Sequence, residues 1–375
     1  MVLEDGAIVL TVNAGSSSLR VSAFRLASQA LQPYWHQRFE GTTAQQLAGM
    51  TERLQALKAR PQLVAHRIVQ GGASLDCAQR VDARLLKNVE AAIELAPLHD
   101  PQALQAYRTS RELLPDTPQV FVPDSGFFVH LPAAARSYAL PQALVDEFQL
   151  HRYGFHGLAH ESMWRGWCAA GGAAWARIIS LQLGGGCSAA LIEGGKPRAT
   201  SMGMTPLAGL VMATRSGDVD PGLILYLIKH AGFSAEQLER LLYRESGLLG
   251  LSGCSGDVSK LLTLSSAAPQ LALATYVERI RHFIGAYMAI AGGIDGIVFG
   301  GGVGENLPAI RAAVLGDMAW CGLAFDGVAN AAAIGHAACI SHANSTIDVR
   351  VHPVDEERLL AEQAVQALVR EPVEA

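Results

Sequence analysis

The sequence predicts an α/β protein built from two related domains that face each other across a cleft. Its 375 residues are too many for one hydrophobic core, so two domains are expected. Two short apolar runs, at residues 8–12 and 178–183, each lead into a turn of small residues and then into a second apolar run. Alternating strand-like and helix-like stretches follow each of these units, which indicates that one half of the fold repeats the other.

Composition restricts the class of protein and its partners. Half of the residues are apolar and 17% are charged, which is typical of a folded globular chain. A net charge of −5 provides no basic surface for nucleic acid. No apolar run reaches the roughly 20 residues of a membrane-spanning helix, and the acidic start is unlike a signal peptide. We therefore expect a cytoplasmic protein with neither nucleic-acid nor membrane partners. The six scattered cysteines form no CxxC pair and are expected to be reduced.

The first turn of small residues reads NAGSSS and spans residues 13–18. Strands are expected before it, at 8–12, and after it, at 19–24. The three consecutive serines and the backbone N–H groups supply more hydrogen-bond donors than a hairpin turn needs, so the turn is a candidate anion site. An ordinary hairpin turn is the alternative.

The second turn reads GGG and spans residues 184–186, between strands expected at 178–183 and 187–192. Consecutive glycines let the backbone approach a ligand closely and point N–H groups at an anion. A proline-bearing loop follows and leads to TRSGD, which places Arg215 among small polar residues. A phosphate-binding turn and an arginine in one segment indicate phosphoryl chemistry. A third glycine-rich segment, GGVGEN at 301–306, follows an apolar strand at 296–299 and is a candidate phosphate or nucleotide loop.

Charged residues at the ends of apolar strands are further candidates. Arg67 lies inside the apolar run 63–69, and a buried arginine needs a carboxylate or a phosphate as its partner. Asp124 follows a short strand and is either a magnesium-facing carboxylate or a turn-capping residue. Glu356 lies in the first turn of the expected C-terminal helix, where acids usually interact with the helix dipole but can also be catalytic. His99, in a proline-bracketed turn, either is structural or faces the site.

Three histidines occur within the ten residues HRYGFHGLAH. His156 and His160 are four positions apart, which is zinc-ligand spacing on a helix, so a zinc hydrolase that also uses His151 is an alternative function. However, the sequence has no HExxH motif, and Gly154 and Gly157 argue against a continuous helix through His156. Other helices are expected at 45–59, 81–95, 161–170, 222–230, 235–243 and 271–290 and at the C-terminus as far as residue 369, with a glycine-punctuated loop at 247–253 and a strand at 347–351.

Seven motifs together resemble those of the acetate kinase family and its propionate kinase relatives. They occur in the order of the family and cover essentially the whole chain. This family lies in the superfamily of actin-like ATPases and sugar kinases, whose domains are duplicated ribonuclease-H-like folds. The motifs are NAGSSSLR (13–20), AHRIVQGG (65–72), LAPLHDP (95–101), RYGFHG (152–157), SMGMTPLAGLVMATRSGDVDP (201–221), SGLLGLSG (246–253) and GGVGEN (301–306).

The resemblance implies reversible, MgATP-dependent phosphorylation of a short-chain carboxylate to an acyl phosphate plus ADP, by direct in-line transfer. Acetate or propionate would be the acceptor, Mg²⁺ or Mn²⁺ the metal, and a homodimer the assembly. It also implies one domain of residues 1–148 with 357–375 and a second, nucleotide-binding domain of residues 149–356. The alternatives are a propionate- or butyrate-preferring enzyme, a pyrophosphate-using enzyme, and a sensor that binds nucleotide or acyl phosphate without turnover.

The resemblance assigns roles residue by residue. It makes Arg67, Arg215, His156 and Asp124 catalytic, and among these His156 and Arg215 stabilise the transition state. Metal-site residues are Asn13, Asp124 and Glu356, and His99 and Ser16 lie close to the site. The carboxylate would be bound by Asn13, Arg67, Val69, Leu98, Phe155 and Pro206, and the nucleotide by Ser18, Arg20, Gly184, Gly185, Gly186, Asp257, Gly301, Gly302, Val303, Gly304 and Asn306.

The sequence also departs from the family pattern, most of all at the second turn. Gln182 and Gly185 stand where the family usually has a histidine and an asparagine, and Arg20 stands where lysine is usual. We therefore expect any difference from an ordinary acetate kinase to begin at Gln182 and Gly185.

Overall fold

The computed structural model describes residues 3–15, 18–92 and 100–369. The chain divides into two compact units, the first made of Met1–Val129 with Asp355–Ala375 and the second of His130–Val354. The sequence placed the domain boundaries after residues 148 and 356 instead, and that domain assignment stays a prediction.

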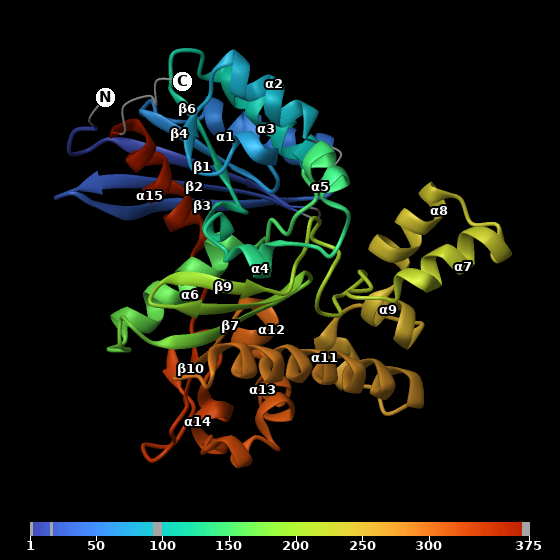
Figure 1. Cartoon of the computed structure of the whole chain (residues 1–375). Helices are drawn as coiled ribbons and strands as arrows, with labels where there is room; N and C mark the ends of the chain where they lie inside the picture. Colours follow the sequence, from blue (N-terminus) through green and yellow to red (C-terminus); the bar gives the residue numbers. More distant parts are fainter. Residues whose placement is uncertain (1–2, 16–17, 93–99, 370–375) are drawn as a thin grey trace. The chain divides into compact units, whose positions relative to one another are not determined.

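The two units share one sheet topology, so the duplicated α/β fold expected from the sequence is confirmed (Figure 1). Within the described residues each sheet has six strands, in the order β3-β2-β1-β4-β6-β5 in the first unit and β9-β8-β7-β10-β12-β11 in the second. In both, the first strand is antiparallel to the next strand and parallel to the fourth. The first unit contains β1 (Ile8–Ala14), β2 (Ser18–Ala27), β3 (Ala30–Glu40), β4 (Leu63–Ile68), β5 (Gln79–Arg80) and β6 (Gln119–Pro123), and the second contains β7 (Arg177–Leu183), β8 (Cys187–Glu193), β9 (Lys196–Thr200), β10 (Gly296–Gly300), β11 (Ala338–Cys339) and β12 (Asp348–Val351).

In the first unit, alternation along the strands sends apolar and polar side chains to opposite faces of the sheet. The even-numbered residues of β1, from Ile8 to Ala14, join an apolar cluster with residues of α1 and α3, among them Met50 and Tyr107. The odd-numbered residue Asn13 points to the other face and contacts α15. The candidate polar residues therefore share the α15 face. The helices are α1 (Thr43–Gln55), α2 (Ala83–Ala91), α3 (Asp100–Leu113) and α15 (Glu356–Val369), with 3₁₀ turns at Gly72–Ser74 and Gly126–Phe128.

The second unit is layered in the same way. Ser180 and Gln182 of β7 lie on one face of the sheet, where α6 packs and His160 contacts Ser180. On the other face Cys187 of β8 contacts Tyr276 of α11. The helices are α4 (Ala133–Arg136), α5 (Gln142–Phe148), α6 (Gly157–Ala169), α7 (Pro221–Ala231), α8 (Ala235–Arg240), α9 (Gly247–Ser252), α10 (Val258–Leu262), α11 (Ala267–Ala291), α12 (Gly301–Asn306), α13 (Pro308–Leu315) and α14 (Gly327–Ala332), with a π-helical turn at Leu241–Glu245 and a 3₁₀ turn at Ala319–Cys321.

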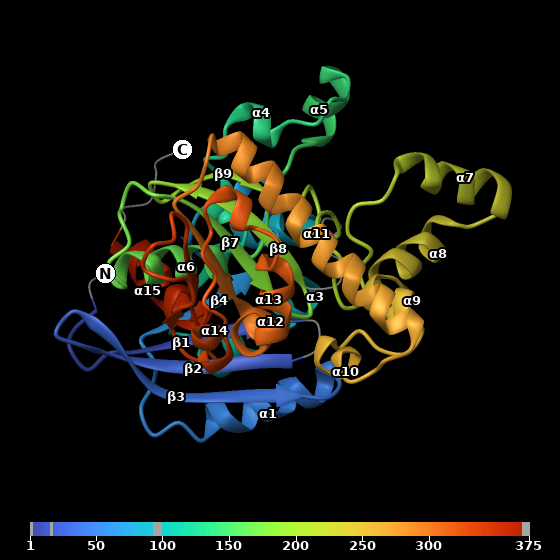
Figure 2. The ribbon, with the colours of Figure 1, turned by 90° about the horizontal axis from the view of Figure 1, so that it is seen from below.

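Several elements differ from the sequence-based expectation. Residues 247–253 form helix α9 instead of a loop, because Gly247 (φ +61°) supplies the left-handed turn at its start and Gly253 (φ +68°) the one at its end. The segment 301–306 is also helical. Strand β3 was not predicted from the sequence, since most of its side chains are exposed and it lies at the sheet edge beside α1 (Figure 2).

Across the part of the chain that the structure describes, no helix combines the length and the apolar character that crossing a bilayer requires.

Candidate active site

The first unit gathers its predicted polar residues into one buried network. The guanidinium group of Arg67, on β4, donates to Asp124 Oδ2 over 2.7 Å and to Asn13 Oδ1 over 3.2 Å. Asn13 Nδ2 in turn donates to Glu356 Oε2 over 3.0 Å. These four side chains come from β1, β4, the residue after β6, and the first turn of α15. Arg67 was expected to need a carboxylate or a phosphate, and in this structure its partner is the carboxylate of Asp124.

The network extends to two residues whose pairing the sequence did not reveal. Arg20 contacts Glu356 Oε2 over 2.6 Å and Glu357 Oε1 over 3.1 Å. Asn13 Nδ2 also lies 3.4 Å from Glu357 Oε1. Glu357 was not among the predicted site residues, although it follows Glu356 directly. Arg20 was predicted to bind nucleotide, and in this structure it holds the two glutamates at the start of α15.

The oxygen atoms of Asn13, Asp124 and Glu356 suit a magnesium ion. Proteins usually bind Mg²⁺ through one or two carboxylates together with substrate phosphates, not through a complete protein cage. Among the described residues no group of three or more His, Cys, Asp or Glu side chains could hold a metal by itself. The first unit thus offers a partial ligand set of the kind that substrate phosphates complete.

The structure shows less about the other predicted site residues of the first unit. Val69 is buried directly after β4, and Ser18 accepts the N–H of Gly15 through its backbone carbonyl over 2.9 Å. Ser16, Leu98 and His99 lie outside the described residues.

In the second unit, His156 and Arg215 converge on the glycine turn. A methyl carbon built on Gly186 would lie 3.3 Å from Cε1 and Nε2 of His156 and 3.7 Å from Nη1 of Arg215. His156 is the residue that precedes α6, and its backbone is left-handed (φ +58°), which is uncommon for a residue other than glycine. This conformation lets the chain turn sharply into the helix, and strained positions of this kind concentrate at functional sites.

The loop that carries Arg215 is fixed to the same turn. The Ala213 N–H donates to the Gly185 carbonyl over 3.1 Å, and Arg215 Nη1 donates to the Pro206 carbonyl over 3.0 Å. Gly184 closes the turn by donating to the Gly186 carbonyl over 3.1 Å. The structure therefore holds the arginine and the glycine turn in one rigid assembly. Phe155 and Pro206, both predicted to contact the acyl group, are buried.

The predicted nucleotide segment 301–306 forms α12, which begins directly after β10. Gly301 has φ +75°, and a Cβ there would lie 2.6 Å from the Leu183 carbonyl oxygen, so glycine is required. Its N–H donates to Glu305 Oε1 over 2.8 Å, and Asn306 Nδ2 donates to the Gly302 carbonyl over 3.0 Å. Glu305 is thus a capping residue that was not predicted from the sequence. Gly302, Val303 and Gly304 complete the helix.

Arg311, on α13, anchors the C-terminal end of α12. Its buried guanidinium group donates to the carbonyls of Gly304 and Glu305 and to the carbonyls of Asn330 and Ala333. It also donates to Asn330 Oδ1 over 2.8 Å. Burial lowers the pKa of Arg311 to about 10, so the group stays charged at neutral pH.

Asp257, also predicted to bind nucleotide, caps α10 by accepting the Ser259 N–H over 2.8 Å.

Gln182 is the topological counterpart of Asn13. Each is the next-to-last residue of the first strand of its unit. The Gln182 side chain lies beside Gly301, because a Cβ on that glycine would be 2.9 Å from Gln182 Nε2. Its Oε1 is buried and has no hydrogen-bond partner among the described residues. The residue that departs from the family pattern therefore lies between the glycine turn and α12.

The histidines do not form a shared metal site. His151 Nε2 lies 2.6 Å from the Arg136 guanidinium, whereas both ring nitrogens of His160 bind serine hydroxyls, those of Ser180 and Ser188. Burial, with the nearby charge of Arg136, lowers the pKa of His151 to about 4. The zinc hydrolase is not supported by this arrangement, since the three rings are held by different partners.

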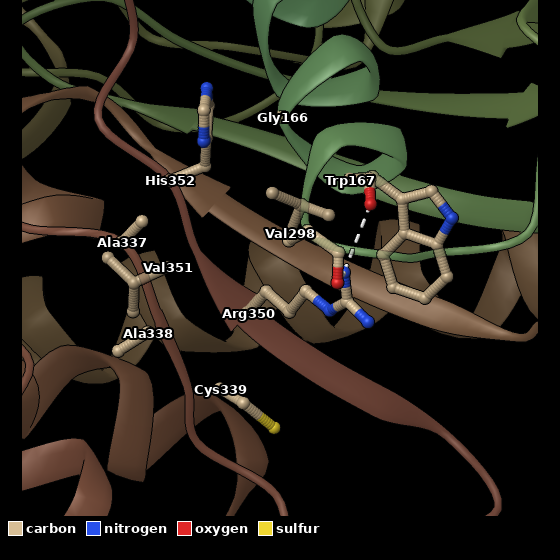
Figure 3. Close-up of a pocket in the computed structure, with 10 residues that line it drawn as sticks. Gly166, Trp167, Val298, Ala337, Ala338, Cys339, Arg350, Val351 and His352 are labelled. Atoms are coloured by element: carbon tan, nitrogen blue, oxygen red, sulfur yellow. Dashed lines mark hydrogen bonds between the residues drawn. The ribbon is translucent and has the colours of Figure 1, made fainter.

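A hollow of about 240 Å³ opens in the second unit between α6 and the strands β11 and β12 (Figure 3). Trp167, Cys339 and His352 line it together with Arg350. The Arg350 guanidinium is held by the carbonyls of Trp167 and Ala170, over 3.0 and 3.1 Å. None of the predicted site residues lines this hollow, so the candidate active site lies elsewhere.

The duplicated α/β fold, with Arg67 near the end of β4 and Arg215 beside the glycine turn, indicates a phosphotransferase. The family follows from comparison with known proteins. The family model described as the Acetokinase family matches residues 27–362, and the chain belongs to this family.

Curated relatives and solved structures agree with this assignment. The acetate kinase of Leifsonia xyli subsp. xyli is 41% identical over 309 residues, which cover 81% of this chain and 78% of the relative. The acetate kinase of Clavibacter michiganensis subsp. michiganensis is 36% identical over 391 residues, covering 96% and 99%. The crystal structure of Porphyromonas gingivalis acetate kinase has a TM-score of 0.86 at 32% identity and covers 96% of this chain and 100% of that one. A propionate kinase from Francisella tularensis has a TM-score of 0.84 at 28% identity, covering 95% and 98%.

Proposed function

We propose that the protein transfers the γ-phosphoryl group of ATP reversibly to a short-chain carboxylate, acetate or propionate, and forms an acyl phosphate and ADP. The family assignment and the curated acetate kinase relatives support the reaction class. The observation that carries the proposal is the convergence of the His156 ring and the Arg215 guanidinium on Gly186. Two side-chain donors beside a glycine turn form a cradle for a transferring phosphoryl group.

The transfer is a single in-line displacement. A carboxylate oxygen forms a bond to the γ-phosphorus while the bond from this phosphorus to the β,γ-bridging oxygen breaks, and the electron pair leaves with ADP. Arg215 and His156 donate to the equatorial oxygens, where negative charge is spread in the transition state. The backbone N–H groups of Gly185 and Gly186 are proposed to bind the nucleotide phosphates, since that of Gly184 donates to the Gly186 carbonyl.

Cys187, which directly follows the turn, does not fit covalent catalysis. Its thiol is buried and donates to the Gly184 carbonyl over 3.2 Å. Burial raises the pKa of this thiol, so it stays protonated and poorly nucleophilic. This supports direct transfer without a phosphoenzyme.

The buried network of the first unit is assigned to the carboxylate and the metal. Arg67 and Asn13 bind the carboxylate substrate, and a guanidinium fork suits this partner. Asp124, Glu356 and Asn13 would hold Mg²⁺ or Mn²⁺. When bound, the ion neutralises charge on the β- and γ-phosphates. Val69, Leu98, Phe155 and Pro206 are proposed to contact the acyl chain, and α12 with Asp257, Ser18 and Arg20 to bind the nucleotide.

We also infer a homodimer that uses helix α7. In the structure as described, this helix buries none of its residues. Figures 1 and 2 show α7 standing away from the sheet of its own unit. Leu223, Leu225, Tyr226 and Ile228 are each 46–59% exposed. An apolar patch of this kind marks an interaction surface, and the same helix of a second copy is its proposed partner. Leu225→Glu should shift the sedimentation coefficient to that of a monomer, and an unchanged dimer would contradict the inference.

The reaction is tested by trapping its product. Purified protein with MgATP, hydroxylamine and acetate or propionate should form the acyl hydroxamate. Arg67→Ala and Arg215→Ala should each lower kcat/KM by about 10²–10³-fold, the loss expected when a donor to the developing charge is removed. Wild-type protein that forms no hydroxamate with either acid, with ATP or pyrophosphate as donor, would favour the sensor without turnover.

The same assay decides the substrate. One methylene in an apolar pocket changes specificity by about 1–3 kcal/mol, so acetate, propionate and butyrate are compared at equal concentrations. ATP, GTP and pyrophosphate are compared as donors in parallel. We expect acetate or propionate with ATP to give the highest kcat/KM, and a preference for butyrate or pyrophosphate would reassign the substrate but not the reaction class.

A further inference from the structure

A chain of four hydrogen bonds runs from His156 into the interior of the second unit. His156 Nδ1 lies 2.8 Å from Ser188 Oγ, and the same hydroxyl lies 2.8 Å from His160 Nε2. His160 Nδ1 lies 2.7 Å from Ser180 Oγ, which donates to the Ala190 carbonyl over 3.4 Å. The chain thus links α6 with the adjacent strands β7 and β8.

The inner members of this chain are inaccessible to water. His160, Ser180 and Ser188 are all 0% exposed. Buried polar groups in native proteins satisfy nearly all of their hydrogen bonds, because an unmade bond costs about 1–3 kcal/mol. The stable arrangement of protons along these four bonds is therefore the arrangement that makes the most hydrogen bonds.

The last bond decides the direction. A backbone carbonyl can only accept, so the Ser180 hydroxyl proton points to Ala190 and its oxygen accepts from His160 Nδ1–H. Neutral His160 then accepts from the Ser188 hydroxyl at Nε2, and the Ser188 oxygen accepts from His156 Nδ1–H. This direction makes all four hydrogen bonds. In the reverse direction Ser180 would donate to His160 instead, and the bond to Ala190 would be lost.

From this we propose that His160, with Ser180 and Ser188, is a positioning relay that keeps Nδ1 of His156 protonated and leaves Nε2 as the nitrogen that gains or loses a proton. The catalytic role of this relay rests on the function proposed above, since Nε2 is the ring nitrogen beside Gly186. His156 then donates to the phosphoryl group only as an imidazolium, and protonation at Nε2 requires no change elsewhere in the relay.

This relay predicts a pH dependence for the phosphoryl-transfer step. Among the described residues, the charged and titratable groups beside His156 are Arg215 across the glycine turn and His160 on α6, whereas the Cys187 thiol lies on the opposite face of β8. His160 stays neutral in the relay, and burial keeps the Cys187 thiol protonated. The kcat should therefore fall as pH rises through the pKa of His156, because the Nε2 donor is lost.

The test reads the tautomer directly by NMR of nitrogen-labelled histidine. In wild-type protein His156 Nδ1 should carry a proton. Ser180 is not the hydrogen-bond partner of His156, but Ser180→Ala removes the acceptor for His160 Nδ1–H. The relay should then reverse, so that His156 Nδ1 becomes an acceptor and Nε2 carries the proton. Thr200→Val is the matched control, since it removes a buried hydroxyl on the neighbouring strand β9 and should leave the His156 signals unchanged.

Kinetics separate the relay from general damage to the fold. Ser180→Ala should abolish the fall of kcat with rising pH, because neutral His156 then carries a proton at Nε2 and remains a donor, while Ser180→Thr should restore that fall. If Ser180→Ala does not fold, Ser188→Ala replaces it and should give a mixture of His156 tautomers. An unprotonated Nδ1 in the wild type, or signals unmoved by these variants, would overturn the relay. Absence of kinase activity with the predicted tautomers would overturn only the proposed function.

Discussion

Replacing Arg67 by methionine is expected to destabilise the first unit by about 3–5 kcal/mol, because the change leaves a buried carboxylate without its cation. Asp124 is 0% exposed and its Oδ2 lies 2.7 Å from the Arg67 guanidinium. Asp124→Leu should destabilise the first unit by a similar amount, since it leaves the buried Arg67 guanidinium without its carboxylate. The double variant, in which two apolar side chains replace the pair, should be close to the wild type in stability, which corresponds to a coupling energy of several kcal/mol.

The unfolding of the first unit can be followed by itself. Trp35 is the only tryptophan in residues 1–129 and 355–375 of the sequence, so its fluorine NMR signal in fluorotryptophan-labelled protein reports this unit during urea unfolding. Activity separates structure from function, since the stable double variant should still lose acyl-phosphate formation. Additive destabilisation by the two changes would refute the buried pair, and an active double variant would refute its role in the reaction.

Three further predictions concern stability and nucleotide binding. Burial lowers the pKa of His66 to about 4, against the smaller opposing effect of the Gln119 hydrogen bond. The unfolded chain therefore binds a proton below about pH 6.5 that the folded chain does not, and the unfolding free energy should fall by up to about 3 kcal/mol between pH 6.5 and 4. His66→Gln should remove this dependence in urea titrations read at several pH values. Gly301→Ala should raise the KM for ATP and leave that for acetate unchanged in steady-state kinetics, whereas Gly285→Ala on α11, where an added Cβ meets no atoms within 4 Å, should change neither. Arg311→Met should lower the thermal midpoint, because it leaves several buried carbonyl oxygens unsatisfied, and an unchanged midpoint would contradict the anchoring role of this arginine.

The strand–turn–strand units could be predicted because their signal is local. An apolar run, a turn of small residues and a second apolar run occur within about twenty residues, and the two copies indicated a duplication that the sheet orders confirm. The partner of Arg67 could be predicted in kind, since a buried guanidinium requires an anion. Its identity as Asp124 follows from the parallel pairing of β4 with β6, which brings the two strand ends together.

Other parts of the site depend on contacts between distant segments. Asn13 and Glu356 are separated by 343 positions, and no periodicity in the sequence brings them together. The partners of His160 lie on β7 and β8, where Ser180 and Ser188 look like ordinary strand residues. Helix α9 was predicted as a loop because its glycines occupy the two ends, where they form the turns that begin and end the helix.

The central claim is that a carboxylate oxygen attacks the γ-phosphorus of ATP, and the fate of that oxygen tests it most directly. Acetate labelled with heavy oxygen in its carboxylate is incubated with the protein and MgATP, and the products are examined by phosphorus NMR and mass spectrometry. One labelled oxygen should become the bridge between carbon and phosphorus in acetyl phosphate and should remain on phosphate after carbon–oxygen cleavage. Acetyl phosphate whose phosphate carries no label after carbon–oxygen cleavage would contradict this attack.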